Sequence, residues 1–229
     1  LSIHRGTRES GTMVEYTVPR QPGMVVLDAI HSVQALHAPD LACRWNCKAG
    51  KCGSCSAEID GKPRLMCMTR MDIFEPGATV TVTPIRTFPI IRDLVTDVSY
   101  NYVKAKQIPP LRLKPPDADG KYRMMQEDVD RPQEFHKCIE CFLCQDVCHV
   151  IRDHEEHKPA FSGPRFFIKV AGLDMHPLDT IDRSEFVRAQ AGIGLCNITK
   201  CCTEVCPEHI HITDNGIIPM KERMADNFD

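Results

Sequence analysis

The feature that most constrains this chain is a run of four cysteines with the spacing C-x2-C-x2-C-x3-C, formed by Cys138, Cys141, Cys144 and Cys148. A run with this spacing wraps a cubane iron–sulfur cluster with its first three thiolates, while the fourth thiolate ligates a different cluster. The run therefore predicts a second cluster, whose other ligands must come from cysteines elsewhere in the chain.

A second run downstream supplies those cysteines. It fits the same template at positions 196, 199, 202 and 206 and is followed by Pro207, but its second ligand position holds Thr199. If the two runs exchange their last cysteines, the second cluster receives only three thiolates and is expected to lose one iron. The spacing therefore predicts a [4Fe–4S] cluster bound by Cys138, Cys141, Cys144 and Cys206. It also predicts a [3Fe–4S] cluster bound by Cys148, Cys196 and Cys202.

Zinc is the alternative metal, because Cys-x2-Cys pairs also build zinc sites. A zinc site takes four ligands in two pairs and does not account for seven cysteines in a crossed pattern. Cys201 falls outside the template. Because adjacent side chains point apart, we do not expect Cys201 and Cys202 to bind the same cluster.

The N-terminal half contains a third motif, C-x4-C-x2-C followed by a distant cysteine, which is the plant-type [2Fe–2S] spacing. Its predicted ligands are Cys47, Cys52, Cys55 and Cys67. Gly50 and Gly53 permit the positive φ and close backbone approach that a tight loop around a cluster needs. Cys43 does not fit the spacing and is left out as a small buried residue.

Composition excludes several other classes of function. The 229 residues suffice for about two domains, and the net charge of −3 gives no reason to expect a nucleic-acid partner. No run of 18 or more apolar residues could span a bilayer, and the first residues lack an export signal. Thirteen cysteines with metal-type spacing therefore indicate a reducing cytosolic compartment rather than disulfide bonds.

Hydrophobic periodicity places the [2Fe–2S] motif in a small α+β domain. Alternation predicts strands over 12–18 and 79–83, and a strand–turn–strand unit over 57–66. Apolar residues at helical spacing predict a helix over 25–37 and a connecting helix over 88–106.

After this segment a proline-rich linker begins, and beyond Pro132 helical patterns surround the two cysteine runs, including 161–175 and 182–190. The predicted domains are therefore 1–105 and 106–229.

The order of these motifs resembles one family, the iron–sulfur subunits of succinate dehydrogenase and quinol:fumarate reductase. The segments that carry the resemblance are residues 26–29, 52–55, 92–97 and 202–207. Residues 44–51 look like the actinobacterial type, whose partner is menaquinone. The resemblance implies a plant-type ferredoxin β-grasp domain followed by an all-α domain similar to bacterial ferredoxins.

The resemblance also implies partners. A flavoprotein subunit would oxidise succinate with FAD, and electrons would pass through the three clusters to menaquinone at a membrane-anchor subunit, with or without haem. The chain would then lie peripherally on the cytoplasmic face of the membrane. The alternatives are fumarate reduction in the reverse direction, or a related heterodisulfide- or glycolate-type oxidoreductase. The latter commonly carries two complete [4Fe–4S] runs, which Thr199 argues against.

In this family the quinone lies beside the [3Fe–4S] cluster. A reduced quinone needs a hydrogen-bond donor or a cation near its carbonyl, which makes His149, Arg152 and Lys221 the candidate quinone-binding residues. The sequence leaves another interpretation open. His149 could instead hydrogen-bond a cluster sulfur, and Arg152 could pair with Asp153 or Glu155.

Overall fold

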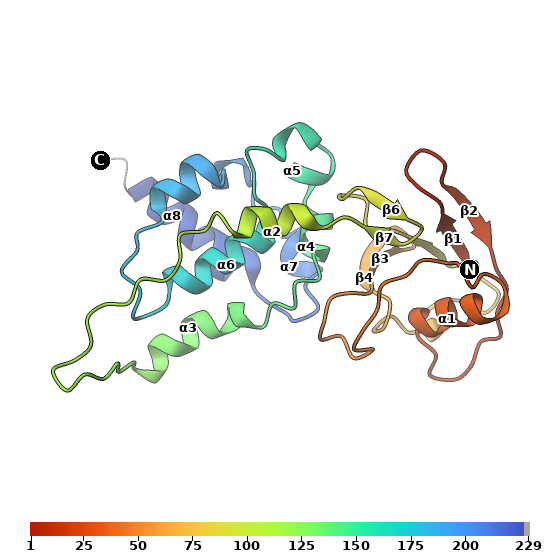
Figure 1. Cartoon of the computed structure of the whole chain (residues 1–229), viewed down its shortest axis with the longest axis horizontal. Coiled ribbons are helices and arrows are strands. Elements are labelled where there is room, and N and C mark those ends of the chain that lie inside the picture. The colour runs from red at the N-terminus through yellow and green to blue at the C-terminus, as the bar shows by residue number, and fades with distance from the viewer. Residues whose placement is uncertain (227–229) are drawn as a thin grey trace. The chain divides into compact units, whose positions relative to one another are not determined.

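The computed structural model describes residues 1–226 and divides the chain into two compact units. Unit 1 comprises Leu1–Val98 and Ile139–Val147, and unit 2 comprises Ser99–Cys138 and Cys148–Asp229. Figure 1 shows the course of the chain. The sequence suggested one boundary near residue 105, whereas the chain returns to unit 1 for a short segment within the first cubane-type run.

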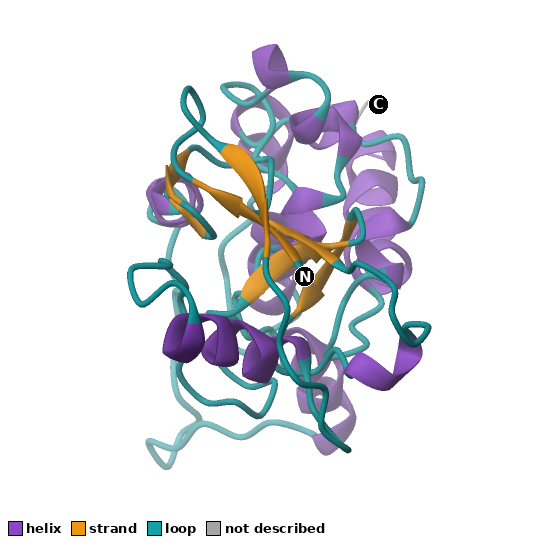
Figure 2. Cartoon of the chain, turned by 90° about the vertical axis from the view of Figure 1, so that its right-hand side faces the viewer, coloured by secondary structure: helices purple, strands orange, loops and turns teal. Residues whose placement is uncertain are grey.

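Unit 1 is built on a five-stranded mixed sheet, whose strands are among those drawn in orange in Figure 2. The strand order is β2-β1-β5-β3-β4. Its strands are β1 (Ser2–Arg5), β2 (Thr12–Glu15), β3 (Ser56–Ile59), β4 (Lys62–Leu65) and β5 (Thr81–Thr83). β1 pairs in parallel with β5, and the other neighbours are antiparallel. Asp60 and Gly61, with φ of 48° and 70°, form the turn of the predicted β3–β4 hairpin. β1 was not expected from the sequence.

The predicted helix over 25–37 is confirmed as α1 (Val26–Leu36), which lies below the sheet in Figures 1 and 2. Its Val26, Ala29, Ile30 and Val33 side chains are fully buried. The Asp28 carboxylate accepts a hydrogen bond from the Val25 N–H at 3.1 Å. This places a negative charge in the first turn, where it is favoured by the helix dipole.

The predicted connecting helix over 88–106 is wrong in its first half. The segment contains β6 (Ile90–Arg92), β7 (Val95–Thr96) and only then the short helix α2 (Ser99–Ala105). Asp93 forms the turn with a φ of 50°, and its carboxylate accepts the Gly6 and Ala42 N–H groups at 2.7 Å each. These hydrogen bonds to residues distant in sequence stabilise the hairpin, and they cannot be inferred from the spacing of the apolar residues.

The segment 139–147 belongs to unit 1 through buried contacts around α4 (Leu143–Asp146). The fully buried Asp146 accepts a hydrogen bond from the Thr87 N–H at 3.1 Å, and the ring of Phe142 packs edge-on against Phe88 with centroids 6.1 Å apart. Burial raises the pKa of Asp146 to about 7, although the bond from Thr87 acts in the opposite direction. The remaining helical turn of unit 1 is η1 (Met71–Ile73).

Unit 2 is helical. Besides α2, its α-helices are α3 (Gln126–His136), α5 (His149–Arg152), α6 (Pro164–Asp174), α7 (Cys201–Glu204) and α8 (Ile218–Asp226). The single 3₁₀ turns are η2 (Glu155–His157) and η4 (Ile193–Leu195), and the short π-helices are η3 (Phe186–Gln190) and η5 (Ile212–Ile217). α6 lies at the centre of unit 2 and packs against α2, α3 and η5.

The core of unit 2 is formed mainly by α6, whose Phe166, Phe167, Val170 and Ala171 are at most 2% exposed. The predicted helices over 161–175 and 182–190 are confirmed with shorter bounds. Within the part of the chain that the structure describes, no helix has both the length and the apolar character needed to cross a bilayer.

Candidate iron–sulfur sites

The loop that begins at Cys47 folds back so that two of its backbone N–H groups face the Cys47 sulfur. The backbone N–H groups of Ala49 and Lys51 lie 3.4 and 3.2 Å from Cys47 Sγ. Lys48 turns the chain back with a φ of 54°, a left-handed value that is uncommon outside glycine. Backbone N–H groups directed at a ligating sulfur are among the features that tune a cluster's reduction potential.

The other predicted [2Fe–2S] ligands lie next to this loop in unit 1. Burial raises the pKa of Cys52, but the hydrogen bonds with Ser54 and Cys47 together outweigh it and lower the pKa to about 7. Burial raises the pKa of Cys55, and the nearby Cys67 and Cys52 thiols add to the effect. The Cys67 N–H also lies 3.5 Å from Cys55 Sγ. Pairwise contacts and charge effects thus link the four thiols of this set, and their ligation of one cluster stays a prediction.

Two features beside this loop were not resolved by sequence reasoning. Lys48 Nζ lies 4.8 Å from the centroid of the Trp45 ring, so its ammonium group is held over an aromatic face. The His31 ring meets the same indole edge-on with centroids 4.8 Å apart.

Cys43 is half-buried. Its thiol contacts the Arg44 carbonyl at 3.6 Å, and burial alone raises the pKa of this thiol to about 12.

The two cubane-type runs have the same local backbone. In the first run Glu140 and Phe142 have φ of 55° and 61°, and in the second Ile198 and Lys200 have φ of 60° and 62°. One short helix follows each pair, α4 in the first run and α7 in the second. Alternating left-handed residues can direct backbone N–H groups toward an anionic group. The similarity therefore supports the register in which the two runs were aligned.

This alignment assigns each residue of the second run to a counterpart in the first. Thr199 takes the place of Cys141, between the two left-handed residues of its run. Cys201 takes the place of Leu143, the first residue of α4 and a buried core residue. The position of Cys201 is therefore a packing position in the first run. Its thiol nevertheless acts electrostatically on both Cys148 and Cys202, and its exclusion from the ligand set stays a prediction.

The predicted [4Fe–4S] ligands are divided between the two units. Cys141 and Cys144 are buried in unit 1, whereas Cys138 and Cys206 belong to unit 2 and are half-buried. Their ligation of one cluster stays a prediction.

The predicted [3Fe–4S] ligands all belong to unit 2. Burial raises the pKa of Cys148 to about 12, and the Cys201 and Cys202 thiols raise it further through their charge. Burial likewise raises the pKa of Cys202 to about 11, with Cys201 and Cys196 contributing. The thiol at the end of the first run is thus within electrostatic range of the Cys201 and Cys202 thiols of the second. Thr213, which was not predicted, places its hydroxyl 3.4 Å from Cys202 Sγ.

Among residues 1–226, no three His, Cys, Asp or Glu side chains converge on a position suited to one metal ion. A zinc site holds its sulfurs about 2.3 Å from a single centre, whereas a cluster spreads its thiolates over several irons.

The candidate quinone residues surround the start of the second run. His149 Nε2 lies 2.8 Å from Asn197 Nδ2, and Lys221 Nζ donates a hydrogen bond to the Cys196 carbonyl at 2.6 Å. The structure thus brings His149 and Lys221 to the same dipeptide. Arg152 pairs with its neighbour Asp153 at 2.9 Å, as the alternative interpretation expected.

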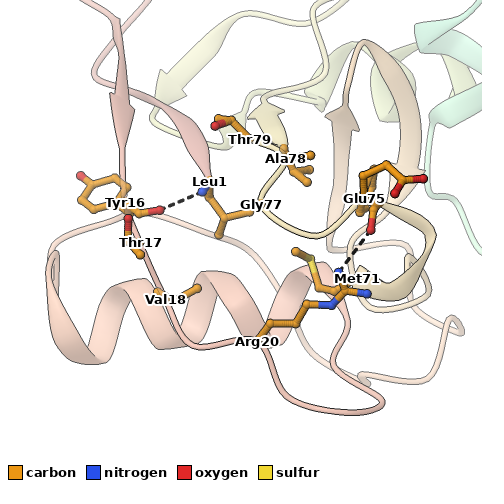
Figure 3. A pocket seen from close by; sticks show the side chains of 12 residues that line it. Leu1, Tyr16, Thr17, Val18, Arg20, Met71, Glu75, Gly77, Ala78 and Thr79 are labelled. Atoms are coloured by element: carbon orange, nitrogen blue, oxygen red, sulfur yellow. Dashed lines mark hydrogen bonds between the residues drawn. The ribbon is translucent and has the colours of Figure 1, made fainter.

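A cavity of about 230 Å³ lies in unit 1 (Figure 3). It is lined by residues that include Leu1, Tyr16, Arg20, Met71 and Glu75. No predicted cluster ligand contributes to its wall.

A mixed sheet with a [2Fe–2S]-type cysteine loop, joined to a helical unit with two cubane-type runs, defines a multi-cluster electron-transfer protein. Residues 1–102 match the family described as "2Fe-2S iron-sulfur cluster binding domain", and residues 134–210 match "4Fe-4S dicluster domain". The chain belongs to the iron–sulfur subunits of succinate dehydrogenase and fumarate reductase, whose role is electron transfer.

Individual relatives support this membership. A chain of the Mycobacterium smegmatis Sdh1 complex in the apo form is 65% identical with a TM-score of 0.96, over 100% of this chain and 96% of that one. The fumarate reductase iron–sulfur subunit of Mycobacterium tuberculosis is 33% identical over 92% of this chain and 85% of its own length. The succinate dehydrogenase iron–sulfur subunit of Bacillus subtilis is 27% identical, over 87% and 81% respectively.

Proposed function

We propose that this chain carries electrons from a flavoprotein subunit that oxidises succinate with FAD to menaquinone at a membrane-anchor subunit. The carriers would be [2Fe–2S], [4Fe–4S] and [3Fe–4S] clusters in that order, and the chain would lie on the cytoplasmic face of the membrane. Support comes from the membership of the chain in this family of subunits, and from the electrostatic effect of the Cys201 and Cys202 thiols of the second run on Cys148.

The chain's own residues would provide ligation and tuning. The four thiols from Cys47 to Cys67 would hold the first cluster, and the N–H groups of Ala49 and Lys51 would stabilise negative charge on Cys47. When bound, the clusters supply one-electron carriers. Substrate oxidation would remain on the flavoprotein.

The test is EPR spectroscopy of the complex purified with this chain. Succinate should reduce the [2Fe–2S] centre, and the oxidised complex should show the signal of a [3Fe–4S] centre. A complex with two [4Fe–4S] centres would contradict the proposed ligand set. A complex whose clusters are not reduced by succinate, but are oxidised by fumarate, would favour the reverse direction.

For the electron exit, we propose that His149 and Lys221 offer the donor and the cation that a quinone carbonyl needs. Both lie beside the Cys196–Asn197 dipeptide, next to a proposed [3Fe–4S] ligand. His149→Ala should leave the cluster signals and succinate-dependent dye reduction unchanged and lower quinone reduction at least about tenfold, because a donor to the reduced quinone is lost.

His154→Ala is the matched control, since His154 is an exposed histidine nearby that pairs with Glu156 at 3.1 Å. Its quinone reduction should equal that of the unmodified complex. Unchanged quinone turnover in His149→Ala would remove His149 from the exit and assign it to the membrane partner.

A further inference from the structure

Within unit 1, the [2Fe–2S] loop meets the backbone of Cys141 at Gly53. A Cβ added to Gly53 would lie 2.6 Å from Cys141 Cα, 2.7 Å from Cys141 N and 2.8 Å from Ile139 O. All three are backbone atoms, so no side-chain rotation could relieve the clash. Gly53 also has a φ of 67°, which disfavours any residue with a Cβ. The absence of a side chain therefore permits this approach.

Ser56 holds the two segments together at the same place. Its hydroxyl lies 2.8 Å from the Cys141 carbonyl and 3.0 Å from the Gly53 carbonyl, and it can donate its one proton to either. Ser56 is the first residue of β3, where it is paired with Leu65 of β4. The hydroxyl is thus carried by the sheet rather than by a free loop.

The two segments in contact belong to different proposed clusters. Gly53 lies between the [2Fe–2S] ligands Cys52 and Cys55, and Cys141 is a proposed [4Fe–4S] ligand. Phe142 follows Cys141 in a left-handed conformation, and its ring packs against Phe88 of the same unit. Because electron tunnelling weakens steeply with distance, a small separation of these backbones would speed transfer between the clusters.

We propose that Ser56, with Gly53, is a positioning residue for electron transfer from the [2Fe–2S] to the [4Fe–4S] cluster. Its hydroxyl keeps the loop of the first cluster against the backbone of a ligand of the second. This role rests on the proposed ligand set, since it requires Cys141 to bind the [4Fe–4S] cluster.

The experiment compares Ser56→Ala, Ser56→Thr and Ser32→Ala in the purified complex. Ser32 is the control, because its hydroxyl also donates to a backbone carbonyl, that of Asp28 at 3.0 Å, but within α1. Two quantities are measured. One is the magnetic coupling between the reduced [2Fe–2S] and [4Fe–4S] centres by EPR, and the other is the rate at which electrons reach the second centre after rapid reduction of the first.

Ser56→Ala should keep both cluster signals, with weaker coupling and a several-fold slower transfer. Ser56→Thr, which retains the hydroxyl, and Ser32→Ala should both match the unmodified complex. Unchanged coupling and rate in Ser56→Ala would overturn the proposal. Loss of a cluster from that variant would overturn it too, because Ser56 would then act in cluster retention. Absence of either cluster from the unmodified complex would instead refute the proposed function.

Discussion

Thr199 stands in the second cysteine run where Cys141 stands in the first, between two residues with left-handed backbone. The site has the local geometry of a cluster loop but offers a hydroxyl in place of a thiolate. A cubane with three thiolates readily loses its unliganded iron, so a single residue would determine the composition of this centre.

Thr199→Cys should restore the missing thiolate and convert the [3Fe–4S] signal of the oxidised complex into that of a [4Fe–4S] centre. EPR and Mössbauer spectra would check the conversion. Cys201→Ser is the control and should retain the [3Fe–4S] centre, because Cys201 takes the place of the packing residue Leu143. If Cys201→Ser changes the cluster type, Cys201 is a ligand and the alignment of the runs is wrong.

Single-residue contacts also distinguish Cys43 from Cys47 as the candidate first ligand of the [2Fe–2S] cluster. Cys47 Sγ accepts two backbone N–H groups, whereas the Cys43 thiol contacts only the neighbouring Arg44 carbonyl among the hydrogen bonds found for it. Cys47→Ser should therefore abolish or strongly alter the [2Fe–2S] absorption and EPR spectra, and Cys43→Ser should leave them unchanged. The opposite pattern would show that the ligand register starts at Cys43.

At the scale of elements, unit 2 depends on a buried arginine. Arg183 is 1% exposed and binds the linker after α2 to the segment after α6. Its partners are the carbonyls of Pro109 and Pro110 at 2.9 and 3.2 Å and the carboxylates of Asp174 and Asp179 at 3.1 and 2.7 Å. In the sequence, these two aspartates flank His176 and could be mistaken for a metal site. In the fold they are ion-pair partners, and His176 accepts the Leu178 N–H at 3.2 Å.

Arg183→Leu should lower the free energy of unfolding by about 3–5 kcal/mol, because it leaves buried carboxylates without this partner. Arg188→Leu is the matched control, since the side chains of Arg188 and its partner Glu185 are 50% and 71% exposed and the pair is worth at most about 1 kcal/mol. Urea denaturation of the cluster-loaded protein, followed by circular dichroism, would measure both. Equal losses in the two variants would contradict the assigned role of Arg183.

For the whole molecule, the three proposed clusters predict how much iron and inorganic sulfide each chain should contain. They contain about nine irons and about ten inorganic sulfides per chain, from the composition of each cluster type. Chemical analysis of the purified complex, corrected for any cofactor of the partner subunits, should approach these values. Zinc without sulfide would refute all three ligand assignments together.

Several features of this protein could be predicted from the sequence because they depend on residues that lie close together along the chain. The cysteine spacings, the glycines of the first loop and the periodicity of α1 each lie within a few turns of chain, where the distances between residues follow directly from backbone geometry. The same holds for the β3–β4 hairpin, whose Asp-Gly turn favours positive φ at both positions.

Other features required the folded chain, because they depend on contacts between residues far apart in sequence. The Asp93 carboxylate accepts hydrogen bonds from the Gly6 and Ala42 N–H groups. These bonds stabilise a hairpin in a segment where the apolar spacing predicted a helix. Burial of Asp146 beside Thr87 places a segment of the first cubane-type run in unit 1. The contact of Ser56 with Cys141 likewise has no counterpart in spacing. Local patterns predicted which cysteines bind clusters, and long-range packing decided that the loops of Gly53 and Cys141 touch.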